Sequence, residues 1–434
     1  MEQRSIQISL SQKGLIFVEI LHIVGQQKLE GTVDISGAKQ SALPCLVAAL
    51  LTEEPVTIEN VPVIEDVEVM LSLLQELGVA IERDGERMTL HAKDAVAMPL
   101  LGSETRKVRA AVYLLGVFAA RFGKGAVGLP GGYAIGPRPI DLHLKALERL
   151  GIKVENESGL YHVNAEKLEG NRIYLDLRSF GATVSAMLAA VLADGTTVIE
   201  NAAIDPEIVD VATMLTSMGA HVIGAGTDEI RIKGVDKLHG CTHTLIPDRL
   251  EAGTFMIYGA VAGEVTVRNV IPTHLEGVIQ KLLDYGADVE VGEETITVRA
   301  NAFKPIDIRV FHYSGYPTDL QPIMSAALLK ADGTSIVTDK LYAQRFRHIA
   351  EMRRMNAQIT LEDASAVIRG GTTLANAEME CADARSGAAL TLAGLQANGE
   401  STVIHAEKLN DSYVDFVGKL KQLGALVWVD EVSE

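Results

Sequence analysis

The sequence predicts an α/β protein of two domains, built from six βαβαββ-like units with three units in each domain. The first observation is a phrase that recurs six times, in which a helix ends at Gly, or once at Asn, and an alternating strand follows. These residues supply the left-handed conformation that closes a helix. Units this long exceed ordinary solenoid repeats and favour two compact domains. The capping positions are Gly78, Gly151, Gly219, Gly286, Asn356 and Gly424.

The second observation is a constant order of elements within each unit. A strand leads into an Ala-rich apolar helix, a β-branched strand and an amphipathic helix follow, and a hairpin closes the unit. The Ala-rich helices carry almost no charge, so we expect them to be buried on all sides. Two units illustrate this order, with first strands over 31–35 and 172–177, apolar helices over 41–51 and 184–192, and β-branched strands over 56–60 and 197–201.

Length and composition exclude several classes of protein. The chain has 434 residues, of which 47% are hydrophobic, as expected for two or three well-packed domains. A net charge of −18 argues against a nucleic-acid partner, because phosphate binding needs a basic face. No apolar run is long enough for a membrane helix, and residues 1–19 are interpreted as an extension, not a signal peptide. Three scattered cysteines, Cys45, Cys241 and Cys381, fit a reducing cytoplasm.

Residues 130–143 have the composition of a loop that carries chemistry. Glycines allow the backbone conformations of a tight loop, and prolines mark its exit before an amphipathic helix over 140–150. The loop holds one arginine, Arg138, and a titratable hydroxyl on Tyr133. Such a loop can close over a substrate and exclude water, although an ordinary surface loop explains the composition equally well.

Several motifs resemble those of the enolpyruvyl transferase family, above all of its members that act on UDP-N-acetylglucosamine and, more distantly, of the shikimate-pathway enzyme. The resemblance runs from about Leu21 to the C-terminus. It implies a two-domain inside-out α/β barrel, with residues 1–38 and 247–434 in domain 1, residues 39–246 in domain 2, and the active site in the cleft between them. The motifs are Ile35-Ser36-Gly37-Ala38-Lys39, Val108-Arg109-Ala110, the 130–143 loop, Pro317-Thr318-Asp319-Leu320-Gln321 and Asp383-Ala384-Arg385.

The resemblance also implies a reaction. The sugar 3-hydroxyl adds to C2 of phosphoenolpyruvate while C3 is protonated, and phosphate then leaves the tetrahedral intermediate. Phosphoenolpyruvate carries a phosphate and a carboxylate, so cations must surround it, and arginine binds such groups bidentately. Taken singly, each candidate cation is more simply a solvated surface charge, and only its motif favours a functional role. The candidates are Lys39, Arg109, Arg138 and Arg385, with Arg345 nearby in the cleft.

Asp319 lies between Pro317-Thr318 and an apolar helix. A structural role as a helix N-cap is open to it, and Thr318 fills that role equally well. The role implied by the family is contact with the sugar 3-hydroxyl and removal of its proton, which needs a carboxylate within hydrogen-bond reach. The motif favours the catalytic interpretation.

The family pattern also indicates residues that bind the nucleotide sugar. Ser179, Phe180 and Gly181 open an Ala-rich helix, whose N-terminal amides are expected to hold the diphosphate. Gln40 stands where the family typically has Asn, and its extra methylene shifts the amide. Leu341, Arg345 and Asp319 complete the substrate-binding set. The uracil-binding stretch is matched by Arg138, Pro139, Ile140, Asp141 and Leu142.

Two positions depart from the family pattern. Tyr133 stands where members usually carry Cys, and sometimes Asp, as the loop proton donor. A phenol, with an ordinary pKa of about 10, is a poorer acid at neutral pH, and it should not be alkylated by the epoxide antibiotic fosfomycin. Asp411 stands where the family usually has an Arg beside phosphoenolpyruvate, and a carboxylate there repels phosphate. The stretch 343–346 has also lost a Glu-Asn pair while keeping Arg345.

These departures leave three interpretations open. The first is a cytoplasmic carboxyvinyl transferase that uses phosphoenolpyruvate and UDP-N-acetylglucosamine in the first committed step of peptidoglycan synthesis. The second is a divergent paralogue that performs the same reaction on another nucleotide or UDP-sugar, with Gln40 and Phe180 as specificity positions. The third is a non-catalytic UDP-sugar-binding protein. Tyr133 and Asp411 favour the third, whereas the intact Lys39, Arg138 and Asp319 oppose it.

Other kinds of site lack support. The chain has no HExxH, no P-loop, no GxSxG and no GxGxxG between a strand and a helix. His239, Cys241 and His243 lie close together, but a plain polar loop explains them better than a metal site. We therefore expect no metal and no cofactor, and the sequence leaves the oligomeric state open.

Overall fold

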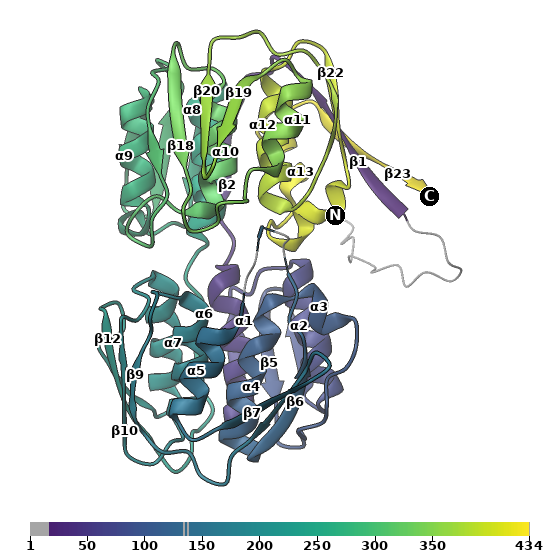
Figure 1. The fold of residues 1–434 in the computed structure, drawn as a ribbon. Helices are drawn as coiled ribbons and strands as arrows, with labels where there is room; N and C mark the ends of the chain where they lie inside the picture. Colours follow the sequence, from purple (N-terminus) through teal and green to yellow (C-terminus); the bar gives the residue numbers. More distant parts are fainter. Residues whose placement is uncertain (1–16, 133–134, 137–138, 434) are drawn as a thin grey trace.

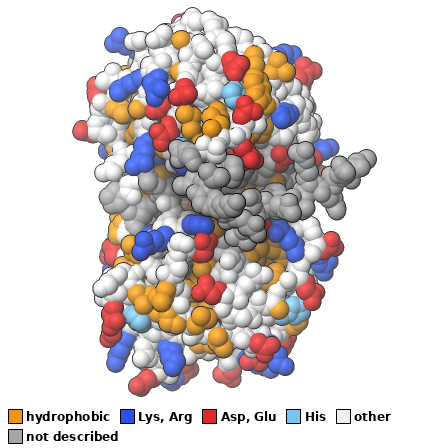
Figure 2. Space-filling model, turned by 90° about the vertical axis from the view of Figure 1, so that its right-hand side faces the viewer, with side chains coloured by type: hydrophobic (Ala, Val, Ile, Leu, Met, Phe, Trp, Pro, Cys, Tyr) orange, Lys and Arg blue, Asp and Glu red, His pale blue; other side chains and the backbone are white. Residues whose placement is uncertain are grey.

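The protein is described by a computed structural model that covers residues 17–132, 135–136 and 139–433. Two lobes lie one above the other and are joined by two chain segments (Figure 1). The core of the lower lobe draws on residues 42–245, and that of the upper lobe on residues 21–35 and 250–427. Acidic and basic side chains are interspersed over both lobes on the face that Figure 2 shows. Within the described ranges, no helix combines the length and apolar character needed to span a membrane.

Three four-stranded sheets form the outside of the upper lobe. The first contains, in spatial order, β15 (Asp288–Val291), β16 (Thr295–Arg299), β14 (Gly263–Arg268) and β2 (Leu29–Asp34). The second contains β17 (Ile308–Arg309), β18 (Thr334–Thr338), β20 (Ser365–Arg369) and β19 (Gln358–Glu362). The third contains β21 (Glu378–Glu380), β22 (Glu400–Ile404), β1 (Phe17–Val24) and β23 (Val427–Ser433).

The lower lobe repeats this arrangement with three further sheets. One contains β13 (Thr242–Thr244), β3 (Val56–Glu59), β5 (Arg87–His91) and β4 (Ala80–Asp84). Another contains β9 (Arg172–Tyr174), β10 (Thr196–Glu200), β12 (Glu229–Lys233) and β11 (His221–Ile223). The last contains only β6 (Lys124–Gly128), β8 (Leu160–Asn164) and β7 (Lys153–Glu157), and a parallel bridge from Leu100 to Val127 stands in for a fourth strand.

One pairing pattern recurs in all five four-stranded sheets. One edge strand runs parallel to its neighbour, and the remaining strands continue as an antiparallel ladder. In β10, Ile199 lies opposite Ile173 on one side and Ile230 on the other, so three β-branched side chains share the core face. The recurrence of this pattern confirms the repeated unit that the sequence predicts.

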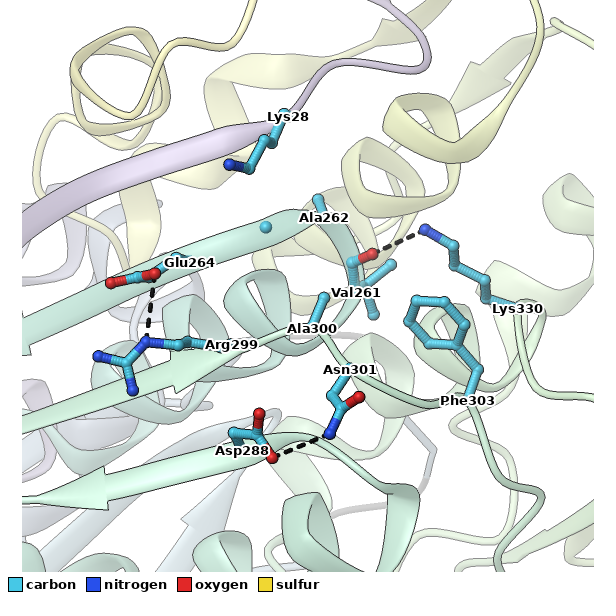
Figure 3. Close-up of a pocket in the computed structure, with 11 residues that line it drawn as sticks. Lys28, Val261, Ala262, Glu264, Asp288, Arg299, Ala300, Asn301, Phe303 and Lys330 are labelled. Carbon is cyan, nitrogen blue, oxygen red and sulfur yellow. Dashed lines mark hydrogen bonds and ion pairs between the residues drawn. The ribbon is translucent and has the colours of Figure 1, made fainter.

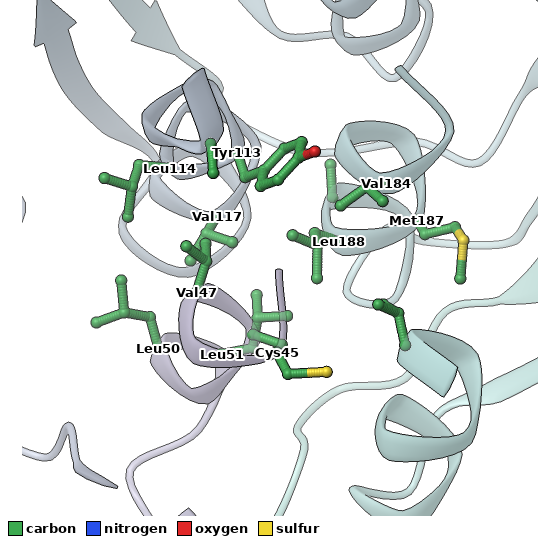
Figure 4. Close-up of a cluster of buried hydrophobic side chains, with 14 of the residues drawn as sticks. Cys45, Val47, Leu50, Leu51, Tyr113, Leu114, Val117, Val184, Met187 and Leu188 are labelled. Carbon is green, nitrogen blue, oxygen red and sulfur yellow. The ribbon is translucent and has the colours of Figure 1, made fainter. Parts of the chain in front are cut away.

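Three apolar helices lie at the centre of each lobe. Side chains from the lower three, α1, α4 and α6, point toward one another in Figure 4. On α4, a Cβ at Gly116 would lie 3.1 Å from the carbonyl oxygen of Ser185 on α6, so the small residue permits close packing of the helices. The prediction that these helices are buried is confirmed. Their bounds are α1 (Lys39–Ala48), α4 (Tyr113–Val117), α6 (Phe180–Ala190), α8 (Arg249–Ala262), α10 (Gln321–Leu328) and α12 (Ala384–Gln396).

Amphipathic helices cover the flanks of the two cores. Each of the six predicted capping residues at their C-terminal ends has a positive φ, between 67° and 101°. The six caps are thus confirmed. The amphipathic helices are α2 (Glu65–Glu76), α5 (Asp141–Arg149), α7 (Pro206–Ser217), α9 (Glu276–Tyr285), α11 (Arg347–Arg354) and α13 (Phe416–Gln422). Shorter helical pieces are α3 (Glu104–Lys107), η1 (Ala49–Leu51), η2 (Arg109–Val112), η4 (Pro272–Leu275), η5 (Thr318–Leu320) and η6 (Ala406–Asp411).

Two segments cross between the lobes and lie side by side. β2 belongs to the upper lobe, but the next helix, α1, belongs to the lower one, whereas β13 lies in the lower lobe and α8 in the upper one (Figure 1). The Ala38 N–H donates to the carbonyl of Ile246, and the Asp248 N–H donates to that of Ser36, both at 2.8 Å. The start of α1 is therefore fixed at the junction of the lobes.

The predicted α/β class, with six units, three per lobe, and apolar helices inside, is confirmed. Among the described strands, the sheets of a lobe remain separate and do not close into one continuous barrel. We propose that the domain boundaries follow the crossings, which gives domain 1 as 1–38 plus 247–434 and domain 2 as 39–246.

Candidate active site between the lobes

Asp319 lies in η5, directly before α10, where its carboxylate meets two buried arginines. Oδ1 accepts a hydrogen bond from Arg345 Nη2 at 2.7 Å and lies 3.7 Å from Arg385 Nε. Burial alone raises the pKa of Asp319, but the charges of Arg345, Arg385 and, across the cleft, Lys39 hold this pKa well below its ordinary value. Neither η5 nor α10 has a side-chain cap, so the N-cap interpretation of Asp319 is wrong.

A hydrogen-bond network behind the ion pair fixes Arg345. Its Nη1 donates to Thr318 Oγ1 at 3.2 Å, and this hydroxyl donates to Asp339 Oδ2 at 2.6 Å. The other oxygen of Asp339 accepts from the N–H groups of Leu341 and Tyr342 at 3.0 and 2.9 Å. Asp339 is fully buried and thereby positions both Thr318 and the segment that leads to Arg345.

Arg385 begins the central helix α12. Asp383 caps this helix, accepting from the N–H groups of Arg385 and Ser386 at 2.9 and 3.0 Å, and Ser386 Oγ accepts in return from the Asp383 N–H at 2.9 Å. The guanidinium lies over the ring of Tyr413, 4.7 Å from its centre. The cap and the ring fix both ends of Arg385, which is buried.

Lys39 opens α1 and contacts both lobes. Its backbone N–H donates to Asp248 Oδ2 at 3.2 Å. Its ammonium forms an ion pair with Asp66 of α2 in the lower lobe. The same ammonium donates to the carbonyl of Asp411 at 3.0 Å and to Ser412 Oγ at 2.9 Å, both in the upper lobe. Lys39 therefore lies at the interface of the lobes, close enough to Asp319 to lower the pKa of that carboxyl.

Asp411, the residue that departs from the family pattern, also lies at this interface. Burial and the carboxylates of Asp66 and Glu65 raise the pKa of Asp411 to about 7, against the opposing charges of Lys39 and Lys408. Asp411 is therefore close to the candidate cation Lys39.

The 130–143 loop starts from a rigid contact. The N–H groups of Gly131 and Gly132 donate to the carbonyls of Thr105 and Arg106, both at 3.2 Å. A Cβ at Gly131 would lie 1.6 Å from the Arg106 carbonyl oxygen, so only glycine fits there.

Further along, the loop approaches the upper lobe. A Cβ built on Gly136 would lie 3.5 Å from the Cβ of Gln344, which belongs to the segment between Leu341 and Arg345. At the loop exit, Arg109 Nη2 donates to the carbonyl of Pro139 at 2.9 Å. Tyr133 and Arg138 lie outside the described residues.

The expected nucleotide-binding residues gather at the starts of α5 and α6, which pack against each other. Ser179 Oγ accepts from the Ala182 N–H at 3.3 Å and caps α6. A Cβ at Gly181 would lie 2.6 Å from the ring of His143 on α5, so glycine lets the helices approach. Pro139 and the buried Ile140 precede Asp141, the first residue of α5. Leu142 and Phe180 pack on the lower core. Gln40 is half-buried in α1.

A separate cavity of about 400 Å³ lies away from this cleft, at the end of the upper lobe where α8 and α10 finish (Figure 3). Lys330 donates to the Val261 carbonyl at 2.8 Å and lies over the Phe303 ring, and Arg299 pairs with Glu264 at 3.2 Å. These contacts lie at the ends of helices and strands, where they bind backbone carbonyls and neighbouring side chains. None of the candidate site residues lines this cavity.

Metal chemistry finds no support within the described part of the chain, where no three His, Cys, Asp or Glu side chains are arranged to hold an ion. His243 Nε2 instead lies 2.9 Å from Asp210 Oδ1, and His239 Nδ1 lies 3.1 Å from the carbonyl of Gly240.

Sequence reasoning missed three residues of the site: Asp66, Asp339 and Ser412. Asp66 follows Glu65 in the first turn of α2, where acidic residues are common because their negative charge interacts favourably with the helix dipole. Asp339 directly follows a strand, a usual place for turn residues. Each has an ordinary local explanation in the sequence, and only the fold brings them to the basic residues.

Known proteins were compared with the chain. A family model described as EPSP synthase (3-phosphoshikimate 1-carboxyvinyltransferase) matches residues 23–420. UDP-N-acetylglucosamine 1-carboxyvinyltransferase 2 of Bacillus cereus is 50% identical over 420 residues, covering 96% of this chain and 98% of that protein. Its namesake in Bacillus subtilis (strain 168) is 47% identical, with the same coverage.

Solved structures share the fold. The enolpyruvyl transferase NikO from Streptomyces tendae has a TM-score of 0.87 at 23% identity, covering 96% of this chain and 99% of its own. EPSP synthase from Acinetobacter baumannii has a TM-score of 0.73 at 20% identity, covering 95% and 100%. At these identities the two structures establish the fold alone. The family model and the bacillary relatives extend over nearly the whole sequence, and by them the chain belongs to the EPSP synthase family of carboxyvinyl (enolpyruvyl) transferases.

Proposed function

We propose that the protein transfers the carboxyvinyl group of phosphoenolpyruvate to the 3-hydroxyl of UDP-N-acetylglucosamine and releases phosphate. This reaction is the first committed step of peptidoglycan synthesis, and we place it in the cytoplasm. The observation that carries the proposal is the Asp319 carboxylate, which Arg345 and Arg385 hold ionised and whose pKa the charge of Lys39 lowers further. A carboxylate for the hydroxyl and cations for the anionic donor are the two requirements of the reaction.

In the addition step, the sugar oxygen forms a bond to C2 of phosphoenolpyruvate, its proton leaves toward Asp319, and C3 receives a proton. In the elimination step, the bond between C2 and the phosphate oxygen breaks and the vinyl ether forms as C3 gives up a proton. Lys39, Arg385 and Arg109 are proposed to bind the phosphate and the carboxylate, together with Arg138 from the loop. Tyr133 is proposed as the acid that protonates C3.

The surroundings of Asp319 bear on when it acts as a base. With Arg345 and Arg385 at 2.7 and 3.7 Å, its lowered pKa makes it a weak base in the unliganded site. Anionic groups of phosphoenolpyruvate near the same arginines offset their charge and raise the basicity of the carboxylate. Binding of the donor thus prepares Asp319 to accept the hydroxyl proton.

The nucleotide is proposed to occupy the lower lobe. The N-terminal amides of α6, behind Ser179, are suited to the diphosphate. The stretch from Arg138 to Leu142, with Pro139 held by Arg109, is proposed to take the uracil, and Leu341 and Gln40 to contact the sugar.

A second candidate function is supported by Asp411, which places a carboxylate group beside Lys39. This second candidate is either the binding of a UDP-sugar without turnover or carboxyvinyl transfer to a different nucleotide acceptor. Phosphate release from phosphoenolpyruvate separates these possibilities. Release that requires UDP-N-acetylglucosamine supports the proposed transfer, and binding of that sugar without release supports the binding protein. If the protein neither releases phosphate nor binds UDP-N-acetylglucosamine, other nucleotide acceptors are tested next.

A further inference from the structure

Between the lobes, three carboxyl groups lie close enough together for two of them to raise the pKa of the third. Glu65 and Asp66 at the start of α2 and Asp411 at the end of η6 form what we call the interlobe acid cluster. The Lys39 ammonium touches the Asp66 carboxylate and the Asp411 carbonyl. Lys408, on the same turn as Asp411, directs its ammonium to the carbonyl of Cys381 at 2.7 Å. The cluster joins residues of both lobes.

The cluster lies where the proposed reaction brings in a further anion. A phosphate oxygen bound by Lys39 must come within about 3 Å of its Nζ. This ammonium already lies 3.0 Å from the Asp411 carbonyl oxygen and in an ion pair with Asp66. With every carboxyl ionised, the phosphate would face two close negative charges that one lysine does not offset. One proton on the cluster removes this conflict.

Asp411 is the carboxyl best placed to take that proton. Asp66 already has Lys39 as a direct ion-pair partner. Burial raises the pKa of Glu65, but the charge of Lys107 on α3 opposes this shift. Asp411 meets Lys39 through its backbone carbonyl. The charged groups that face it are Asp66 and Glu65 from α2, Lys39 from α1 and Lys408 from η6, and with burial they bring the pKa of Asp411 to about 7.

We propose that Asp411 must carry a proton for phosphoenolpyruvate to bind at Lys39, and that this residue makes the affinity for phosphoenolpyruvate depend on pH. The inference rests on the proposed function. As a neutral carboxyl, Asp411 donates a hydrogen bond to a phosphate oxygen, and as a carboxylate it repels the phosphate. The proton comes from solvent when the donor binds and returns to solvent when phosphate leaves.

The test measures the KM for phosphoenolpyruvate in acceptor-dependent phosphate release between pH 7 and 9. The phosphate of the substrate loses its last proton at about pH 6, so it contributes little to the change over this range. For the unsubstituted protein, the KM for phosphoenolpyruvate rises roughly tenfold per pH unit once the pH exceeds the Asp411 pKa, because one proton is required. The KM for UDP-N-acetylglucosamine stays nearly constant. Asp411→Asn, which cannot ionise, gives a flat profile.

The control variant is Asp332→Asn, which makes the same chemical change at an exposed residue in the turn before β18. It retains the steep profile. Asp411→Arg also gives a flat profile, with a lower KM for phosphoenolpyruvate at pH 8, and it serves if the Asn variant fails to fold. Equal slopes in the unsubstituted protein and the Asp411 variants would overturn the inference while leaving the transferase function intact. Absence of release from the unsubstituted protein at every pH would overturn the proposed function, and the inference with it.

Calorimetry of the unsubstituted protein supplies a measurement that needs no variant. Phosphoenolpyruvate is titrated at pH 8, without the acceptor sugar, in two buffers that differ in ionisation enthalpy. The difference in heat reports the uptake of about one proton per phosphoenolpyruvate bound. Binding without proton uptake would contradict the role of Asp411.

Discussion

Asp319, which is half-buried, and the buried Arg345 form an ion pair across 2.7 Å, and this pair joins two distant segments of the upper lobe. Arg345 comes from the segment between β18 and α11, whereas Asp319 lies in η5, directly before the central helix α10. The pair itself is neutral. Because Arg385 lies 3.7 Å from Asp319, the three side chains together carry a net positive charge. In the proposed function, the anionic donor binds near the two arginines and the carboxylate accepts the hydroxyl proton.

Asp319→Asn is expected to abolish most of the activity. The amide keeps the shape of the side chain but neither accepts the hydroxyl proton nor balances the arginines, so kcat falls by about 10²–10⁴-fold. Steady-state phosphate release measures the effect, and Asp332→Asn serves as the control with unchanged kcat. Asp319→Asn with activity close to that of the unsubstituted protein would rule out Asp319 as the base.

Arg345→Ala tests the stability of the same pair. Removing the arginine leaves the half-buried Asp319 beside Arg385 alone, and breaking a buried pair costs about 3–5 kcal/mol of unfolding free energy. Urea denaturation followed by circular dichroism measures this loss. The matched control is Arg268→Ala, because Arg268 forms an exposed pair with Asp34 at 2.8 Å. Its removal barely changes stability. Equal effects of the two substitutions would contradict the assignment of a buried network.

Asp411→Asn is expected to stabilise the protein more at pH 8 than at pH 5. In the folded protein the pKa of Asp411 is about 7, above its value in the unfolded chain, so the folded state binds more protons between the two values. Stability therefore falls as the pH rises through this window and stays reduced above it. Melting temperatures of the variant and the unsubstituted protein at both pH values measure the difference. A gain of equal size at pH 5 and pH 8 would show that Asp411 keeps its ordinary pKa.

Tyr133→Cys restores a thiol at the loop position where related transferases usually carry one. We expect the unsubstituted protein to remain unmodified by fosfomycin, because a phenol does not open the epoxide under these conditions. The variant acquires one adduct by intact-mass spectrometry and turns over faster, because a thiol is the better acid at neutral pH. A stoichiometric adduct on Tyr133 itself would refute the predicted insensitivity. Tyr133→Cys without any gain in turnover would favour a binding protein.

Much of the fold was accessible from the sequence because its signals are local. A capping residue such as Gly286 needs a positive φ wherever it occurs, and the uncharged stretch around Val47 has no stable place except a core. The crossing of the chain at Lys39 has no such local mark. It depends on β2 pairing with β14, more than 200 residues later, and was available only through the family resemblance.

The candidate site was accessible in part, for a related reason. Motifs identified Lys39, Asp319 and Arg385, but residue type alone did not show which carboxylates would meet them. Asp66 meets Lys39 only because α2 packs beside α1, and Asp411 reaches the same point from the other lobe. Pairings between lobes depend on three-dimensional placement, and these pairings set the pKa of Asp411.

The most direct test of the central claim follows the bridging oxygen of phosphoenolpyruvate, the atom between C2 and phosphorus. With this oxygen labelled as ¹⁸O, carboxyvinyl transfer to UDP-N-acetylglucosamine breaks the bond to carbon, so the released phosphate carries the label and the sugar gains a carboxyvinyl ether. Mass spectrometry of both products reads the outcome. Labelled phosphate that appears only with the acceptor present is the predicted result. Unlabelled phosphate would mean cleavage between phosphorus and oxygen and would contradict the proposed transfer. Release that does not require the acceptor would contradict it as well.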